Sequence, residues 1–196
     1  MPKIEREKIR LGVSACLLGE RVRYDGGHKR AATLLRALGP DVEWIAVCPE
    51  VELGLGVPRP PIVLAGASRA PRLVEPTSGR DLTVRMRRLA EARARQLVRL
   101  GLDGFVLKSR SPSCGLRGVP VVGKDGRPRA TGRGIFATEL GRHARGLAIE
   151  EESRLVDPRV RAHFLMRVRT AAQRRARAAS AAASAERTQS ATPTPR

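Results

Sequence analysis

Apolar runs alternate with glycine- and proline-rich breaks along the first three quarters of the chain. Four of these runs have the length and composition of strands, and they lie at residues 8–18, 42–47, 104–109 and 146–152. Apolar residues between the runs recur at helical spacing, which predicts helices at 29–38, 81–100 and 134–144. Strands that alternate with helices favour parallel pairing through crossover connections. The pattern therefore predicts an α/β fold built on a mainly parallel open sheet of about four strands with flanking helices.

Three further segments carry weaker signals. Residues 57–66 are rich in proline and predict a loop with a short extended piece. Residues 71–79 predict an edge strand or a loop, and residues 115–132 are rich in glycine and turn-like.

The chain divides into three parts by composition. Residues 1–152 form the predicted Rossmann-like α/β domain. Residues 153–178 are basic and predict a helical extension, with Phe164, Leu165 and Val168 on one side. Residues 179–196 consist mostly of alanine, serine, threonine and proline, a composition that predicts disorder.

The chain is strongly basic, with a formal net charge of +19 over 196 residues. Most of this charge comes from arginine, and residues 153–196 alone hold ten arginines against two acidic residues. A basic chain favours contact with nucleic acid. However, abundant arginine together with abundant alanine is also what a GC-rich genome produces. Charge alone therefore leaves contact with RNA, through the basic surface or the tail, as an open hypothesis.

Hydropathy and the N-terminal segment predict a cytoplasmic protein. No apolar run approaches the roughly 20 residues that a membrane span needs. The first 13 residues are mixed in charge and lack the apolar core of a secretory signal. In the cytoplasm cysteines serve more often as ligands, nucleophiles or small core residues than as disulfides.

Each of the three cysteines lies at the C-terminal end of a predicted strand, the first of which is expected to end near Ser14–Cys16. Cys16, Cys48 and Cys114 should therefore converge, because the carboxyl ends of parallel strands share one edge of a sheet. Thiolates are soft ligands, and three of them leave one coordination position open on a tetrahedral zinc ion or a 4Fe–4S cluster. The alternative is that each cysteine is a small buried hydrophobic residue.

Candidate proton-transfer groups lie next to these cysteines. Glu50, two residues after Cys48, could act as a general base, cap a helical turn or pair with an arginine. Ser111 and Ser113 flank the proline before Cys114, where serine hydroxyls commonly bond the backbone of a turn.

Other polar residues could position a substrate or a metal group. Ser14 lies two residues before Cys16 and is a candidate for this role. Lys108 could contact an anionic substrate or extend to solvent, and Asp25 fits a turn before two glycines. His28 is the one plausible fourth ligand for zinc.

Three long motifs resemble the thiouracil desulfurase (TudS) family. They read GVSACLLGERVRYDGGHK, VCPEVELGLGVPRPP and LKSRSPSCG, and they occur in the family's order over about residues 8–152. The resemblance implies a 4Fe–4S cluster held by Cys16, Cys48 and Cys114, with one iron free of protein ligands. It implies acid–base roles for Glu50 and Ser111, and a role for Asp25 in positioning the substrate or the cluster.

The resemblance implies non-redox desulfuration of thiolated pyrimidines, in which thiouracil gives uracil and sulfide. Some relatives carry a second helical domain and look similar to enzymes that act on thiolated tRNA; after residue 152 this sequence is expected to hold a basic extension in place of that domain. Either the protein acts on free thiolated bases or nucleosides, or its basic tail serves as an RNA tether, so desulfuration of thiolated tRNA nucleosides is an alternative. Two other hypotheses are a basic RNA-binding module with a structural zinc, and a carrier that passes sulfide onward. The oligomeric state is not predicted.

Overall fold

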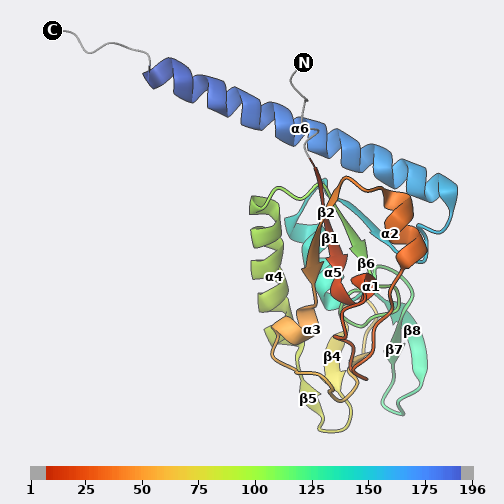
Figure 1. Ribbon diagram of the computed structural model, residues 1–196. Helices are drawn as coiled ribbons and strands as arrows, with labels where there is room; N and C mark the ends of the chain where they lie inside the picture. The colour runs from red at the N-terminus through yellow and green to blue at the C-terminus, as the bar shows by residue number, and fades with distance from the viewer. Residues whose placement is uncertain (1–7, 191–196) are drawn as a thin grey trace.

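A four-stranded parallel sheet forms the centre of the protein (Figure 1). The computed structural model describes residues 8–190, with side chains described up to residue 182. The strand order is β2-β1-β6-β9. The strands are β1 (Ile9–Ser14), β2 (Val42–Val47), β6 (Gly104–Leu107) and β9 (Ala148–Glu151). The predicted α/β fold and its four parallel strands are confirmed.

The register of the sheet aligns the carboxyl ends of its strands. β1 pairs with β2 from Ile9 opposite Val42 to Ser14 opposite Val47. Both strands end at this last pair, so the two segments leave the sheet at the same level. The next residues of each segment are consequently delivered to one edge of the sheet, as expected for parallel strands.

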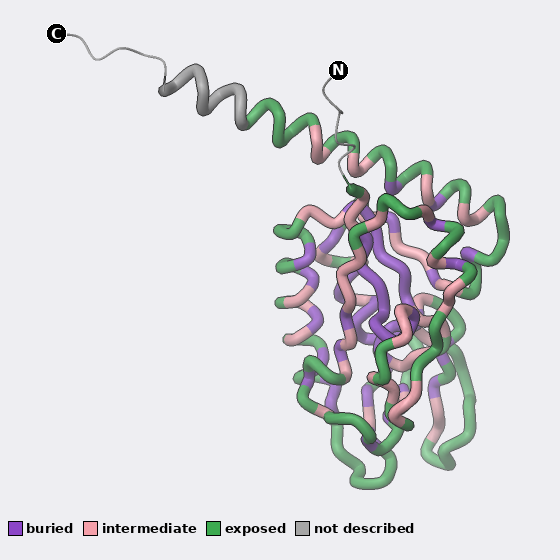
Figure 2. The backbone as a smooth tube through the Cα atoms, in the orientation of Figure 1, coloured by how far each residue is buried: buried purple, intermediate pink, exposed green. Residues whose placement is uncertain are grey.

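Helices cover both faces of this sheet. They are α1 (Ala15–Leu18), α2 (Ala32–Leu38), α3 (Pro49–Glu52), α4 (Thr83–Arg99), α5 (Ile135–His143) and α6 (Pro158–Ser190). On one face α4 and α5 pack together over buried Phe105 and Leu107 of β6. On the other face α2 and α6 enclose Leu11 and Val13 of β1. Figure 2 shows the resulting buried interior along the strands.

A second sheet of five strands lies beyond the carboxyl ends of the first (Figure 1). Its order is β5-β4-β3-β7-β8, with β3 (Val63–Ala65), β4 (Arg72–Glu75), β5 (Arg80–Asp81), β7 (Val119–Val122) and β8 (Pro128–Gly132). The prediction that 115–132 is only turn-like is therefore wrong. The strands escaped the pattern because they are short, contain proline and, in β8, are exposed apart from the half-buried Gly132.

Helix α6 runs past the point where the sequence predicts disorder. It continues beyond residue 178 to Ser190, which corrects that prediction for 179–190; residues 191–196 lie outside the described residues. The alanine-rich composition explains the correction, because alanine has the highest helix propensity. Phe164 and Val168 bury the first half of the helix against the sheet, and the second half extends past the body (Figure 1). Among the described residues no helix has the length and apolarity to span a membrane.

Candidate active site

A cavity of about 390 Å³ opens at the carboxyl ends of β1, β2 and β6. Its walls contain seven of the ten residues that the sequence singles out for the site: Ser14, Cys16, Cys48, Glu50, Lys108, Ser111 and Cys114. Asp25, His28 and Ser113 are not part of the cavity wall. The expectation that three cysteines distant in sequence meet at one sheet edge is therefore confirmed as geometry.

Three different local structures present the cysteines. Cys16 lies in α1, directly after β1, and its carbonyl accepts a hydrogen bond from the Lys29 amide at 2.9 Å. Cys48 lies between β2 and α3, with Pro49 at the first position of the helix. Cys114 is seven residues past the end of β6, so a loop rather than the strand itself returns it to the cavity. All three are free thiols.

Burial controls the protonation of these thiols. It raises the pKa of Cys16 to about 11, with the neighbouring Cys48 adding to the effect. Burial also raises the pKa of Cys48, and that of Cys114 well above its ordinary value; a hydrogen bond from the Ser14 hydroxyl partly offsets the latter. Burial therefore favours the protonated form of these thiols, and a bound metal must displace the protons.

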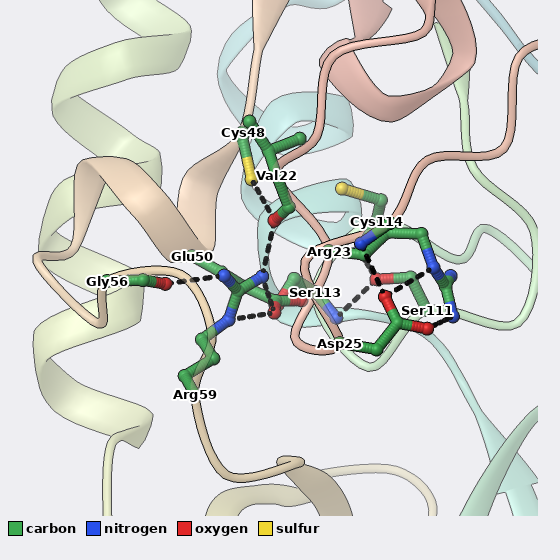
Figure 3. A network of polar contacts seen from close by, with 11 residues as sticks. Val22, Arg23, Asp25, Cys48, Glu50, Gly56, Arg59, Ser111, Ser113 and Cys114 are labelled. Carbon is green, nitrogen blue, oxygen red and sulfur yellow. Dashed lines mark hydrogen bonds and ion pairs between the residues drawn. The ribbon is translucent and has the colours of Figure 1, made fainter.

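Glu50 is held from two sides (Figure 3). Its Oε2 accepts hydrogen bonds from Arg59 Nε at 3.0 Å and from Arg59 Nη2 at 2.7 Å. Its Oε1 accepts a hydrogen bond from the Ser113 hydroxyl at 3.0 Å. The carboxylate thus links segments that are 63 residues apart in sequence. The alternative that Glu50 pairs with an arginine is confirmed, and it is compatible with a place in the cavity wall.

Ser111 organises the loop that carries Cys114. Its Oγ accepts hydrogen bonds from the amides of Ser113 at 3.2 Å and Cys114 at 3.1 Å. This is the turn chemistry expected for serine in such a loop. Because the hydroxyl is an acceptor in both bonds, its own proton stays available for a bound molecule.

Ser14 and Lys108 connect two strand ends. The Ser14 hydroxyl accepts a hydrogen bond from the Lys108 amide at 2.9 Å. The Lys108 ammonium pairs with Glu152 and also donates to the Ser109 hydroxyl at 3.0 Å. Lys108 therefore has a carboxylate partner within the protein, and this partner neutralises the charge that an anionic substrate would need.

Asp25 lies outside the cavity wall and acts locally. Its carboxylate accepts a hydrogen bond from the Gly27 amide at 3.0 Å and pairs with Arg23 at 3.4 Å. The Gly27 hydrogen bond, with help from Arg23, lowers the pKa of Asp25. The structure thus shows Asp25 in the turn role that the sequence also suggested.

Two residues of the site were missed or given no role by sequence reasoning. Arg59 is 8 % exposed and touches Glu50, and it stands within the VPRPP string of the second motif. Ser113 is fully buried and bonds Glu50, although from the sequence it was only a turn former. A buried arginine is rare unless it is paired, but its burial could not be read from the sequence.

The cavity suits a soft metal group by donor type. Three thiols line it, and they lie close enough for Cys48 to add to the rise in pKa that burial causes in Cys16 and Cys114. Four cations also line it: Arg23, Lys29, Lys108 and Arg110. Positive neighbours stabilise thiolates. Within the described residues no set of three or more His, Cys, Asp or Glu side chains is grouped so that it could hold a metal ion. The fit therefore rests on donor type and on one shared cavity.

Comparisons with known proteins identify relatives of most of the chain. A sequence model of the 2-thiouracil desulfurase family matches residues 11–152. The uncharacterized protein YbbK of Bacillus subtilis (strain 168) is 30% identical over 133 residues, which cover 65% of this chain and 87% of that protein. The solved structure of a 4Fe-4S-dependent thiouracil desulfidase, TudS (DUF523Vcz), is 36% identical with a TM-score of 0.61 and covers 82% of this chain and 99% of its own.

Proposed function

The chain belongs to the 2-thiouracil desulfurase family, and on this premise we propose that it removes sulfur from thiolated pyrimidines with a bound 4Fe–4S cluster. The observation that supports this most strongly is one cavity that three free thiols, the Glu50 carboxylate and the Ser111 hydroxyl line together. The solved relative named as 4Fe-4S-dependent has the same fold at 36% identity.

Cys16, Cys48 and Cys114 are the residues that would hold the cluster. When bound through three thiolates, a 4Fe–4S cluster supplies an iron without a protein ligand, which is a soft Lewis acid suited to a thiocarbonyl sulfur. Lys108 and Arg23 lower the pKa of Cys16, which offsets part of the rise that burial causes.

Glu50 acts as the general base that takes a proton from the attacking water. A carboxylate has about four acceptor positions on its two oxygens. Arg59 takes two on Oε2, and Ser113 takes one on Oε1. Among the hydrogen bonds of the described residues this leaves one lone pair, on Oε1, for a water molecule. Proton transfer by such a positioned group contributes about 10²- to 10⁴-fold to the rate.

Ser111 donates its proton toward the pyrimidine ring nitrogen. Its oxygen is fixed by two backbone amides, so the direction of the hydroxyl is the only freedom left to it. In the net reaction water adds to the ring carbon, the C–S bond breaks, and sulfur leaves as sulfide while a carbonyl forms. The carbon keeps its oxidation state, so the reaction needs no electron donor or acceptor.

The test is anaerobic purification and reconstitution, followed by analysis of iron, zinc and sulfide. We expect the loaded protein to release uracil from 2-thiouracil or 4-thiouracil, with one sulfide per uracil. Tightly bound zinc without iron would favour the structural-zinc hypothesis and contradict this proposal. Uracil without free sulfide, together with sulfur transferred to an acceptor, would favour a sulfide carrier.

Thiolated RNA is a second candidate substrate, and α6 favours it. Arg169, Arg174 and Arg177 are exposed on this helix and form no ion pair within the described part of the chain. A row of unpaired arginines fits the phosphate backbone of RNA. A chain in which these three arginines are replaced by glutamine, compared with the wild-type chain on thiolated tRNA and on free thiouracil, tests this. We expect only the tRNA reaction to weaken.

A further inference from the structure

Arg59 is the most highly connected buried charge next to the cavity. Its side chain is 3% exposed, and its guanidinium donates to Glu50, to the Gly56 carbonyl at 2.7 Å and to the Val22 carbonyl at 2.9 Å. Its backbone amide donates to the Tyr24 carbonyl at 2.9 Å. An arginine is suited to such a position because its planar donors can serve several acceptors in fixed directions.

These contacts join all three segments that carry the cysteines. The Val22 and Tyr24 carbonyls belong to the loop that follows Cys16. Glu50 belongs to the segment of Cys48, and through Ser113 it reaches the segment of Cys114 (Figure 3). No other side chain with a hydrogen bond in Figure 3 reaches both the loop after Cys16 and Glu50.

The same contacts decide which oxygen of Glu50 stays available. Arg59 occupies Oε2 with two hydrogen bonds, so the unused lone pair of the carboxylate lies on Oε1. Without the guanidinium, the carboxylate could rotate and offer either oxygen.

We propose that Arg59 is a positioning residue that locks the three cysteine-bearing segments together through Glu50 and aims the Oε1 of that carboxylate for proton transfer. The part concerning proton transfer rests on the proposed function; the part concerning the segments does not. Arg59 touches neither substrate nor metal in this role, and it acts only through Glu50 and the backbone of the loop.

The experiment compares Arg59→Met with the wild-type chain in two states. In the cluster-free protein, amide exchange at Arg23 and Gly26, whose amides close the loop at 3.2 and 3.0 Å, should become about tenfold faster or more, as expected when hydrogen bonds to a charged group are lost. In the loaded protein, kcat should fall about 10²-fold with KM nearly unchanged, because a misplaced base affects the transition state.

Arg93→Met is the matched control. Arg93, in α4, also pairs with a glutamate of helix α3, Glu52, at 3.3 Å, but this pair joins the two helices and does not line the cavity. We expect the control to leave loop exchange and kcat at wild-type values. Arg59→Lys keeps the charge but cannot make the paired bonds to Oε2, so it should restore loop protection only partly and leave kcat low.

The outcomes separate the two proposals. Unchanged exchange at Arg23 and Gly26 in Arg59→Met, or an equal change in Arg93→Met, would overturn the positioning role. If Arg59→Met does not fold, the same exchange measurement on Arg59→Lys decides, and wild-type protection there would contradict the proposal. If the loaded wild-type protein releases no uracil, the proposed function fails, while exchange in cluster-free protein still decides the role of Arg59.

Discussion

The cavity and helix α6 use positive charge in opposite ways. At the cavity, Arg59 and Lys108 each have a carboxylate partner, Glu50 nine residues away and Glu152 44 residues away in sequence. Along α6, Arg174 and Arg177 are exposed without such a partner in the described part of the chain. The net charge of +19 therefore mixes two kinds of arginine. The paired arginines hold chain segments in place, and the unpaired arginines are available to bind a polyanion such as RNA.

The largest effect should come from removing the proposed base within the paired region. In Glu50→Gln we expect kcat to fall by about 10²- to 10⁴-fold. The glutamine side-chain oxygen can still accept from Arg59, so bound iron per chain should stay at the wild-type value. Uracil release and iron content, measured on the same reconstituted sample, test both statements. Full activity in a cluster-loaded Glu50→Gln protein would show that another group is the base.

One arginine of α6 belongs to the paired kind, and it sharpens the contrast within a single helix. Arg175 donates to both carboxylate oxygens of Asp103, which is 1 % exposed. Arg175→Met should lower the free energy of unfolding by about 3 kcal/mol, because it leaves a buried charge without its partner. Arg174→Met, one residue away and exposed, should change it by less than about 0.5 kcal/mol.

Urea unfolding of the two variants measures this difference. Similar unfolding midpoints for Arg175→Met and Arg174→Met would mean that α6 is not anchored by its buried ion pair. The contrast between paired and unpaired arginines would then not hold within this helix.

The next effect concerns close packing beside Cys114. A Cβ on Gly134 would lie 2.4 Å from the Ser113 carbonyl oxygen, which is backbone and cannot move aside cheaply. Gly134→Ala should therefore cost about 1–3 kcal/mol and weaken cluster retention. Gly141 lies within helix α5, whose N-cap residue is Gly134. A Cβ on Gly141 would meet only the end of the Arg133 side chain, so Gly141→Ala should be neutral or slightly stabilising. Chemical unfolding and loss of bound iron to a chelator measure both variants.

The sequence predicted the first sheet well and the second sheet poorly, for a physical reason. β1 and β6 are buried on both faces, so their runs are almost continuously apolar. β7 and β8 form a hairpin in which most of β8 is exposed, and its composition looks like a loop. β7 also pairs with β3, more than 50 residues earlier in the chain, and a local pattern does not contain that pairing.

The candidate site shows the same limit. The three cysteines, Glu50 and Ser111 could be proposed because motif and strand position both point to them. The function of Arg59 could not, because it consists of hydrogen bonds to Val22 and Glu50 across intervening chain. Asp25 is the opposite case, because its motif suggested a role at the site. Its hydrogen bonds are only with residues two positions away in sequence.

The smallest effect on the fold and on thiouracil turnover should come from the unpaired arginines of α6. We expect Arg169→Gln, Arg174→Gln and Arg177→Gln, combined in one chain, to leave the unfolding midpoint and kcat for thiouracil unchanged, since these side chains are exposed and distant from the cavity wall. Binding to RNA should respond instead. Each lost phosphate contact should reduce the slope of log affinity against log salt concentration by about one.

Fluorescence anisotropy with a short RNA at several salt concentrations measures that slope. Lys124 with Arg127, exposed at the β7–β8 turn, provides a control that removes two positive charges where the α6 set removes three, and their replacement by glutamine should leave the slope unchanged. An equal loss per charge removed in both sets of substitutions would mean that RNA responds to net charge alone. A wild-type chain that binds no RNA would remove thiolated RNA as a candidate substrate and leave free thiolated pyrimidines, because the cavity does not depend on these arginines.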